Sequence, residues 1–174
     1  FTTDQHPMVR DPDVAYAYGH FLGDRYRDRT HIIWLMGGDA FSRPDRATLT
    51  PPWRRMTEAL ARGVADGVNG VHDRTGRANW DTTFMSYHPP GGGKSSSEFF
   101  HNEPWLDFNM IQSTTRFGLR NYETVHADYV RTPVKPTLDA EVAYEYSLPL
   151  NQRELRQRPG DRITAWDVRR AAYW

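Results

Sequence analysis

The sequence contains no cysteine among its 174 residues. Disulfide bonds and thiolate metal sites are therefore excluded, and cysteine usage gives no indication of the redox compartment. The sequence also lacks an apolar run of about 18 residues, the length that a membrane-spanning helix requires. We therefore expect no contact with a membrane. The opening residues, FTTDQHPMVRDPD, do not have the charged start and apolar stretch of a signal peptide, so any such segment would lie outside this chain.

The sequence has no excess of charge of either sign. It contains 22 Lys and Arg residues and 22 Asp and Glu residues, so the formal net charge is zero. Because no basic run is available to follow a polyanion, nucleic acid is not an expected partner. No two histidines have the close spacing of a metal site, such as H-x-H or H-E-x-x-H. The sequence therefore predicts neither a metal centre nor another cofactor.

Aromatic residues are abundant, with six tryptophans, nine tyrosines and eight phenylalanines. They are sufficient to build a hydrophobic core despite the polar average composition. Aromatic side chains also suit sugar binding, although core packing is the commoner reason for their presence.

Helical and strand patterns alternate along the whole chain. Asp11 and Pro12 are typical of a helix start, and the apolar run HIIWLM is typical of a strand that is buried on both faces of a parallel sheet. Ser95 and Glu98 fit a capping box at the start of a short helix. We expect helices over 11–28, 50–68, a short stretch from 95, 121–131 and 164–174, and strands over 31–36, 80–88, 107–113 and 136–141.

The helix expected over 121–131 carries Tyr122, Val125 and Tyr129 at helical spacing, which predicts that these three residues face inward. Strands that alternate with helices indicate an α/β fold in which right-handed crossovers join the strands of a parallel sheet. No repeat or linker divides the chain, so residues 1–174 are expected to form one domain. Four units of one strand and one helix fit either an open doubly wound sheet or half of an eight-stranded barrel. A complete barrel typically needs about 250 residues, more than this chain has.

The carboxyl ends of the expected strands carry polar residues, and function sits at these ends in both architectures. Asp39 and Glu141 follow the first and fourth expected strands, which are not adjacent. In a barrel they would converge on one pocket, as the two carboxyl groups of a glycosidase do. Asp39 could instead be a helix N-cap or a salt-bridge partner, and Glu141 could instead be a loop carboxylate that is paired with an arginine. The other residues at strand ends are His88, Gln112 and Ser113.

The stretch HPPGGGKSSSEFF, residues 88–100, partly fits a phosphate-binding loop. The pattern G-x-x-x-x-G-K-[ST] places its last glycine at Gly93 but requires a glycine where the sequence has His88. The broken pattern argues against a nucleotide site, and a flavodoxin-like nucleotide binder is a distant alternative. Ser95, Ser96 and Ser97 are expected to be helix caps.

Four blocks of sequence resemble the apiosidase-like glycoside hydrolases of family 140. They are WLMGGD at 34–39, YHPPGGGKSSSEFFHNEPWLDFNMIQS at 87–113, KPTLDAEVAYE at 135–145 and DVRRAAYW at 167–174. The resemblance implies a (β/α)8 TIM barrel of which about half is present, namely strands 4–7. It also implies that Asp39 is the general acid/base and Glu141 the nucleophile of a retaining reaction. The two carboxyl groups would then lie about 5–5.5 Å apart.

Two other glutamates compete for these roles. Glu103 lies in an N-E-P sequence like the one that carries the acid/base in many related enzymes, but it precedes an expected strand instead of following one. Glu145 is the nearest competitor for the nucleophile, although a structural or substrate-binding role suits its place beyond the strand better. Residues expected to support the site or bind sugar are His88, Gln112, His101 and Trp105, each of which could instead be a satisfied polar residue or a core residue.

The resemblance also implies what surrounds the chain. A half barrel leaves open sheet edges, so we expect the remainder of the barrel or a completing chain as a partner, and little activity without it. The implied substrate is a carbohydrate, such as the apiose-linked side chains of plant cell-wall pectin. The implied location is the bacterial periplasm or the exterior. A noncatalytic carbohydrate-binding fragment is the alternative function.

Overall fold

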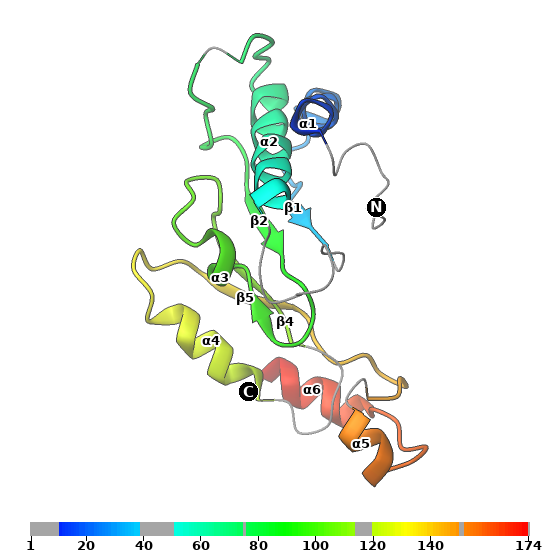
Figure 1. Cartoon of the computed structure of the whole chain (residues 1–174). Coiled ribbons are helices and arrows are strands. Elements are labelled where there is room, and N and C mark those ends of the chain that lie inside the picture. The colour runs from blue at the N-terminus through cyan, green and yellow to red at the C-terminus, as the bar shows by residue number, and fades with distance from the viewer. Residues whose placement is uncertain (1–10, 39–50, 75, 114–119, 150–151, 174) are drawn as a thin grey trace. The chain divides into compact units, whose positions relative to one another are not determined.

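The computed structural model describes residues 11–38, 51–74, 76–113, 120–149 and 152–173 (Figure 1). Asp39 and Thr50 therefore lie outside the described residues. The chain divides into two compact units, each described by itself below. Unit 1 runs to Pro90 and includes Asn102–Asp107, whereas unit 2 comprises Gly91–His101 and the chain from Phe108 onward.

Unit 1 contains two helices and two parallel strands. The backbone N–H of Asp13 donates to the carboxylate of Asp11 at 2.8 Å, and Pro12 occupies the first helical position, so the first helix begins where the sequence predicts. The strand partners run from Trp34 with Met85 to Gly37 with His88. The elements of unit 1 are α1 (Pro12–Tyr26), β1 (Trp34–Gly37), α2 (Pro51–Val68) and β2 (Met85–His88).

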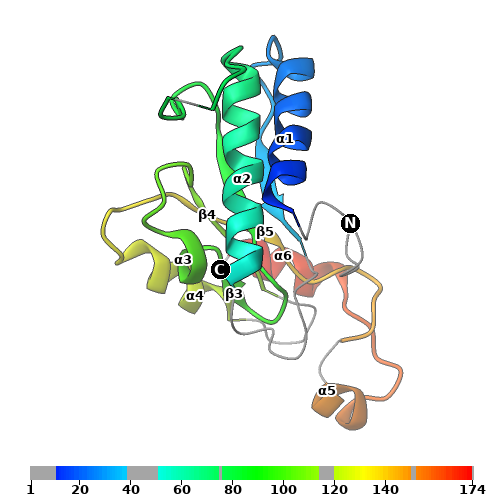
Figure 2. The ribbon, with the colours of Figure 1, turned by 45° about the horizontal axis from the view of Figure 1, so that its top comes forward.

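Helices α1 and α2 lie side by side (Figures 1 and 2). Their contact is made by glycines spaced four residues apart on each helix: Gly19 and Gly23 on α1, and Gly63 and Gly67 on α2. A Cβ atom at any of these positions would overlap a backbone carbonyl oxygen of the other helix. The two backbones therefore approach more closely than larger side chains would allow.

The expectation that the first strand is buried on both faces is wrong. Met36 is buried, but Ile33 and Leu35 are 55% and 47% exposed. Successive side chains of a strand point to opposite faces, and the described part of the chain covers only one face of β1.

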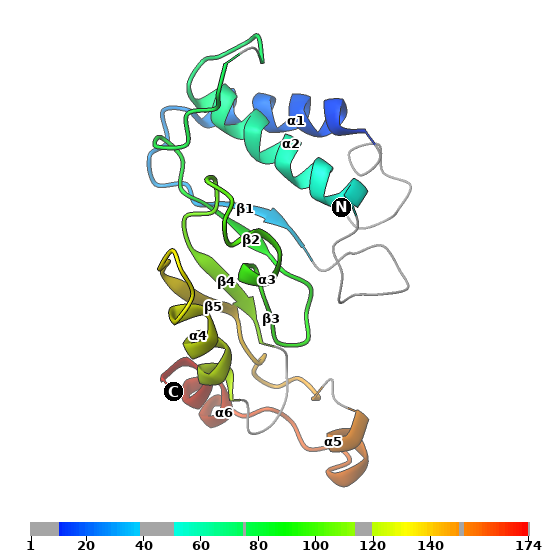
Figure 3. The same cartoon turned by 60° about the vertical axis from the view of Figure 1, so that its left-hand side comes forward.

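Unit 2 contains a three-stranded sheet in the order β3–β4–β5, with α4 beside it (Figure 3). Strands β4 and β5 are parallel, as predicted, but β3 runs antiparallel to β4 and was not predicted, and neither was α5. Gly91, Gly92 and Gly93, here called the glycine loop, lead into β3, where Lys94 pairs with Gln112. The elements are β3 (Lys94–Ser95), α3 (Ser97–Phe100), β4 (Asn109–Gln112), α4 (Asn121–Tyr129), β5 (Thr137–Glu141), α5 (Gln152–Gln157) and α6 (Ala165–Tyr173).

The predicted inward face of α4 is wrong for Tyr122 and Tyr129, whereas Val125 is half-buried. Tyr122 and Tyr129 are 43% and 67% exposed, whereas Asn121 and Asp128 are buried. The buried pair is hydrogen-bonded: Asn121 donates to Asp139 at 2.9 Å, and Asp128 accepts from Ser95 at 2.5 Å. These polar contacts determine the inward face, because burying an unpaired carboxylate or amide is costly.

The last helix begins as predicted. The backbone N–H of Thr164 donates to Asp167 at 3.0 Å, and the N–H of Asp167 donates to the Thr164 hydroxyl at 3.3 Å, which completes a capping box before α6. Among the helices of the described residues, none is long and apolar enough to cross a membrane.

Candidate functional site

In unit 1, the parallel strands β1 and β2 have their carboxyl ends side by side. Gly37 pairs with His88, and the backbone N–H of Gly38 donates to the His88 carbonyl at 3.2 Å. Asp39 comes next in the chain but lies outside the described residues, so its predicted position and its separation from Glu141 stay predictions. What the structure does show is that the backbone leading to Asp39 ends beside His88.

The ring of His88 is oriented by its own loop. Its Nδ1 lies 2.9 Å from the carbonyl oxygen of Pro89. Because a carbonyl can only accept, Nδ1 must carry a proton in this contact. This contact fixes the orientation of the ring at the end of β2.

In unit 2, a bulge between β4 and β5 determines which face Glu141 occupies. Ile111 pairs with Asp139, but the next pair is Gln112 with Glu141, so one residue of β5 is skipped. Paired residues share a face of the sheet, and neighbours along a strand alternate. Glu141 therefore lies on the opposite face from Asp139, whereas strict alternation would place both on the same face.

The position of helix α4 identifies the two faces. Asp139 accepts a hydrogen bond from Asn121 of α4, so Asp139 lies on the helix-covered face. Glu141 and Gln112 share the other face. This is the face that α4 does not cover.

The glycine loop packs against Gln112. The backbone N–H of Gly93 donates to the Gln112 carbonyl at 3.0 Å, and a Cβ atom on Gly91 would lie 3.4 Å from the amide of the Gln112 side chain. The backbone N–H of Ser113 donates to the Glu141 carbonyl at 3.2 Å. The structure thus brings Gln112 and Glu141 together at neighbouring strand ends, with Gln112 held by the loop.

The residues that suggested a phosphate loop are used within the fold. Lys94 forms an ion pair with Glu98 at 2.7 Å. The hydroxyl groups of Ser95 and Ser97 both donate to the buried carboxylate of Asp128. A carboxylate at this position would repel a phosphate, which argues against nucleotide binding.

His101 and Trp105 are both buried. The ring nitrogens of His101 lie 2.9 Å from the Pro133 carbonyl and 3.3 Å from Oδ1 of Asn109. Both nitrogens are therefore occupied by protein atoms. The interior positions favour the alternative of a satisfied polar residue for His101 and of a core residue for Trp105 over a role in substrate binding.

Glu103 lies in the connection from α3 to β4, as expected from the sequence. Its carboxylate forms an ion pair with Arg54 of α2 at 3.0 Å. The next residue, Pro104, lines a depression of about 370 Å³ together with Trp34 and Phe84, which lie at the amino ends of β1 and β2. The surroundings of Glu103 therefore do not match a strand's carboxyl end.

An open groove lies in unit 2 beyond the end of β5. Its volume is about 630 Å³, and it is lined by residues 145–146, 158, 160–165 and 167. Glu145 lines this groove and is exposed. The expectation that Glu145 is a structural or substrate-binding group stays a prediction.

Asp167 supplies a fixed negative charge to the groove. Partial burial raises the pKa of its carboxyl group, but hydrogen bonds from Thr164 and the charges of Arg170 and Arg158 outweigh that effect, so the pKa is lowered overall. Asp167 is thus ionised at neutral pH.

Sequence reasoning missed this groove, because most of its lining, residues 145–146, 158 and 160–163, lies outside the expected helices and strands. The conformation that distinguishes it, a positive φ at Tyr146, has no sequence signal, since tyrosine rarely adopts that conformation. In the part of the chain that the structure describes, no group of three or more His, Asp or Glu side chains could hold a metal ion.

Comparisons with known proteins show what the chain is similar to. The sequence model of the family described as "Apiosidase-like, catalytic domain" matches residues 2–174. One similar solved structure is titled as a glycoside hydrolase family 5 protein from Bacteroides vulgatus ATCC 8482, with 31% identity and a TM-score of 0.71 over 94% of this chain and 32% of that chain. A second, titled "Glycoside hydrolase", has 31% identity and a TM-score of 0.71 over 94% of this chain and 35% of that one. No curated protein matches. The mixed α/β fold thus resembles glycoside hydrolase barrels, and the chain spans about a third of the length of these two relatives.

Proposed function

Because this chain belongs to the apiosidase-like family of glycoside hydrolases, we propose that it carries the catalytic residues of a retaining glycosidase. Glu141 is the nucleophile and Asp39 the general acid/base. The observation that carries the proposal is the bulge in β5, which moves Glu141 to the face opposite α4, beside Gln112. Bulges next to active sites commonly re-aim a side chain in this way.

The reaction proceeds in two displacements. Ionised Glu141 attacks the anomeric carbon and forms a glycosyl ester, while protonated Asp39 gives its proton to the departing glycosidic oxygen. Asp39, now a carboxylate, takes a proton from water, which attacks the anomeric carbon and releases Glu141. The double displacement retains the anomeric configuration.

Gln112 and His88 support this chemistry from the ends of β4 and β2. Gln112 pairs with Glu141 in the ladder, so its amide is placed to orient the nucleophile or to donate to a sugar hydroxyl. The ring of His88, oriented by the Pro89 carbonyl, hydrogen-bonds the sugar or orients Glu141. The reaction needs no metal or other cofactor.

The family name supports a proposal for the substrate class. We place the activity on plant cell-wall polysaccharide, such as apiose-linked side chains of pectin, and the protein in the periplasm or outside the cell of a bacterium. Strands β1, β2, β4 and β5, the four that the sequence predicts, correspond to barrel strands 4–7. The remainder of the barrel, from further sequence or a completing chain, supplies the rest of the pocket.

The decisive experiment replaces Glu141 by alanine in a complete barrel and measures turnover of an activated aryl glycoside. Glu141→Ala should abolish essentially all turnover while sugar binding persists, because the nucleophile is lost but the pocket is kept. Added azide, a small nucleophile that fits the space left, should restore part of the turnover and yield a glycosyl azide.

Glu123→Gln is the matched control, since Glu123 is exposed on α4 and paired with Arg120 at the surface. It should leave turnover unchanged. Unchanged turnover in Glu141→Ala would reject the nucleophile assignment. Binding of sugar without turnover by the unmodified barrel would favour a noncatalytic carbohydrate-binding role.

A further inference from the structure

The groove in unit 2 is built from two segments that are hydrogen-bonded to each other. The backbone N–H of Tyr146 donates to the Ile163 carbonyl at 2.8 Å, and the N–H of Ile163 donates to the Ser147 carbonyl at 2.9 Å. Ile163 is buried beneath this contact. The groove floor is therefore fixed by backbone bonds and a buried apolar side chain.

Tyr146 is held in an unfavourable backbone conformation. Its φ is +67°, in the left-handed region that bulky residues seldom occupy. Asn or Gly would relieve the cost, yet the position carries a tyrosine. Such local strain is often kept at functional sites, where the fold fixes a side chain in a needed place.

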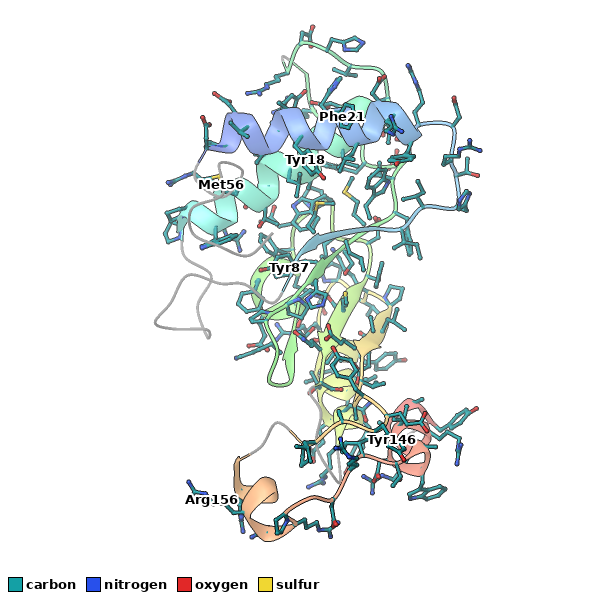
Figure 4. All side chains as sticks on the ribbon, turned by 90° about the vertical axis from the view of Figure 1, so that its right-hand side faces the viewer. Tyr18, Phe21, Met56, Tyr87, Tyr146 and Arg156 are labelled. Carbon is teal, nitrogen blue, oxygen red and sulfur yellow. The ribbon has the colours of Figure 1, made fainter. Side chains whose placement is uncertain are left out.

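The side chain that this conformation presents is open to solvent (Figure 4). Tyr146 is 77% exposed. The guanidinium of Arg162 lies 5.9 Å from the ring centroid, and Arg162 also donates to the Tyr146 carbonyl at 2.8 Å. Arg162 thus steadies the tyrosine without burying it, so most of the ring surface stays available.

The charges around the groove nearly balance. Glu145, Asp161 and Asp167 contribute carboxylates, and Arg158 and Arg162 contribute guanidinium groups. A site of this kind offers both donors and acceptors but no strong field of one sign. It suits a neutral, hydroxyl-rich ligand better than a polyanion.

We propose that Tyr146 is a stacking platform for a neutral sugar residue of the substrate chain, in a binding subsite beyond the end of β5. The apolar C–H face of a sugar ring packs on the exposed aromatic ring, while its hydroxyls bond to the groove carboxylates and arginines. This inference rests on the proposed function for the identity of the ligand. The subsite itself lies wholly within the described residues of unit 2.

Calorimetry of the 174-residue chain with cellotetraose, xylotetraose and arabinotetraose tests the platform without requiring turnover. The chain should bind at least one of these neutral probes. Tyr146→Phe keeps the ring and should change the affinity by less than about twofold, whereas Tyr146→Asn should weaken binding roughly tenfold because the stacking surface is lost. Asn tolerates a positive φ, so the second variant removes the ring without adding backbone strain.

Circular dichroism confirms that each variant is folded, and Tyr146→Gly is a second ring-free variant that the backbone accepts. Equal affinity of Tyr146→Asn and the unaltered chain would overturn the platform, as would failure of all three neutral probes or binding of tetragalacturonate alone. Turnover by Glu141 variants is measured separately. The platform can therefore fail while the glycosidase assignment holds, and the reverse can also occur.

Discussion

At the scale of single residues, Asp128 shows how the glycine- and serine-rich segment is held. Its carboxylate is buried in α4 and accepts hydrogen bonds from the hydroxyl groups of Ser95 and Ser97. Arg131 lies 3.6 Å away at the surface. The loop that packs on Gln112 is therefore tied to a helix by one charged group. Two serines of the motif that resembles a phosphate-binding loop, Ser95 and Ser97, therefore bind a carboxylate within the fold.

Replacing Asp128 by alanine should lower the free energy of unfolding by about 2–4 kcal/mol, because two buried hydroxyl donors lose a charged acceptor. Urea denaturation of the chain measures the change. Glu123→Ala on the same helix is the control and should stay within about 0.5 kcal/mol, since its ion pair is exposed. An equally small change in Asp128→Ala would show that the carboxylate is not needed for stability.

At the scale of elements, the sequence predicted which helices and strands exist better than it predicted their orientation. Helices α1, α2, α4 and α6 and four strands form where the patterns place them. The prediction that Tyr122 and Tyr129 face inward is nevertheless wrong. It rests on their hydrophobicity, whereas the hydrogen bonds of Asn121 and Asp128 determine how α4 packs. The spacing of apolar residues along a helix does not show which polar side chains have partners that are distant in the sequence.

The glycine contact between α1 and α2 gives a sharp test at this scale. A Cβ atom on Gly63 would overlap the carbonyl oxygen of Tyr16 and lie 2.9 Å from the backbone nitrogen of His20. Gly63→Ala should therefore destabilise the chain by about 1–3 kcal/mol, although alanine favours an isolated helix.

Thermal unfolding or urea denaturation checks this expectation against Gly76→Ala. No neighbouring atom lies within 4 Å of a Cβ atom placed on Gly76, so that variant should be nearly neutral. A stable Gly63→Ala variant would mean that the two helices can separate without cost.

At the scale of the whole molecule, the chain spans about a third of the length of its two solved relatives. Catalysis in the proposed mechanism requires carboxylates from the ends of β1 and β5 to lie across one glycosidic bond. In the relatives' fold a closed barrel supplies that geometry. We infer that the barrel's other strands are needed to hold the two acids at their working distance.

The 174-residue chain alone should therefore turn over an aryl glycoside at least roughly 100-fold more slowly than the same chain completed to a barrel, because misplacement by about 1 Å costs that much. Initial rates at matched concentrations measure the ratio. Robust turnover by the monomeric chain would contradict this expectation.

The sequence by itself determined the alternation of helices and strands, the residues at the strand ends and, through four blocks of residues, the family. These properties depend on residues that are close together in the sequence or on their order along the chain, so a sequence pattern can predict them. Tertiary structure decided which face Glu141 occupies, since one skipped residue in β5 reverses the side that alternation predicts. It also decided that His101 and Trp105 are interior residues and that Tyr146 is exposed beside a groove, because burial depends on segments that meet only in the folded chain.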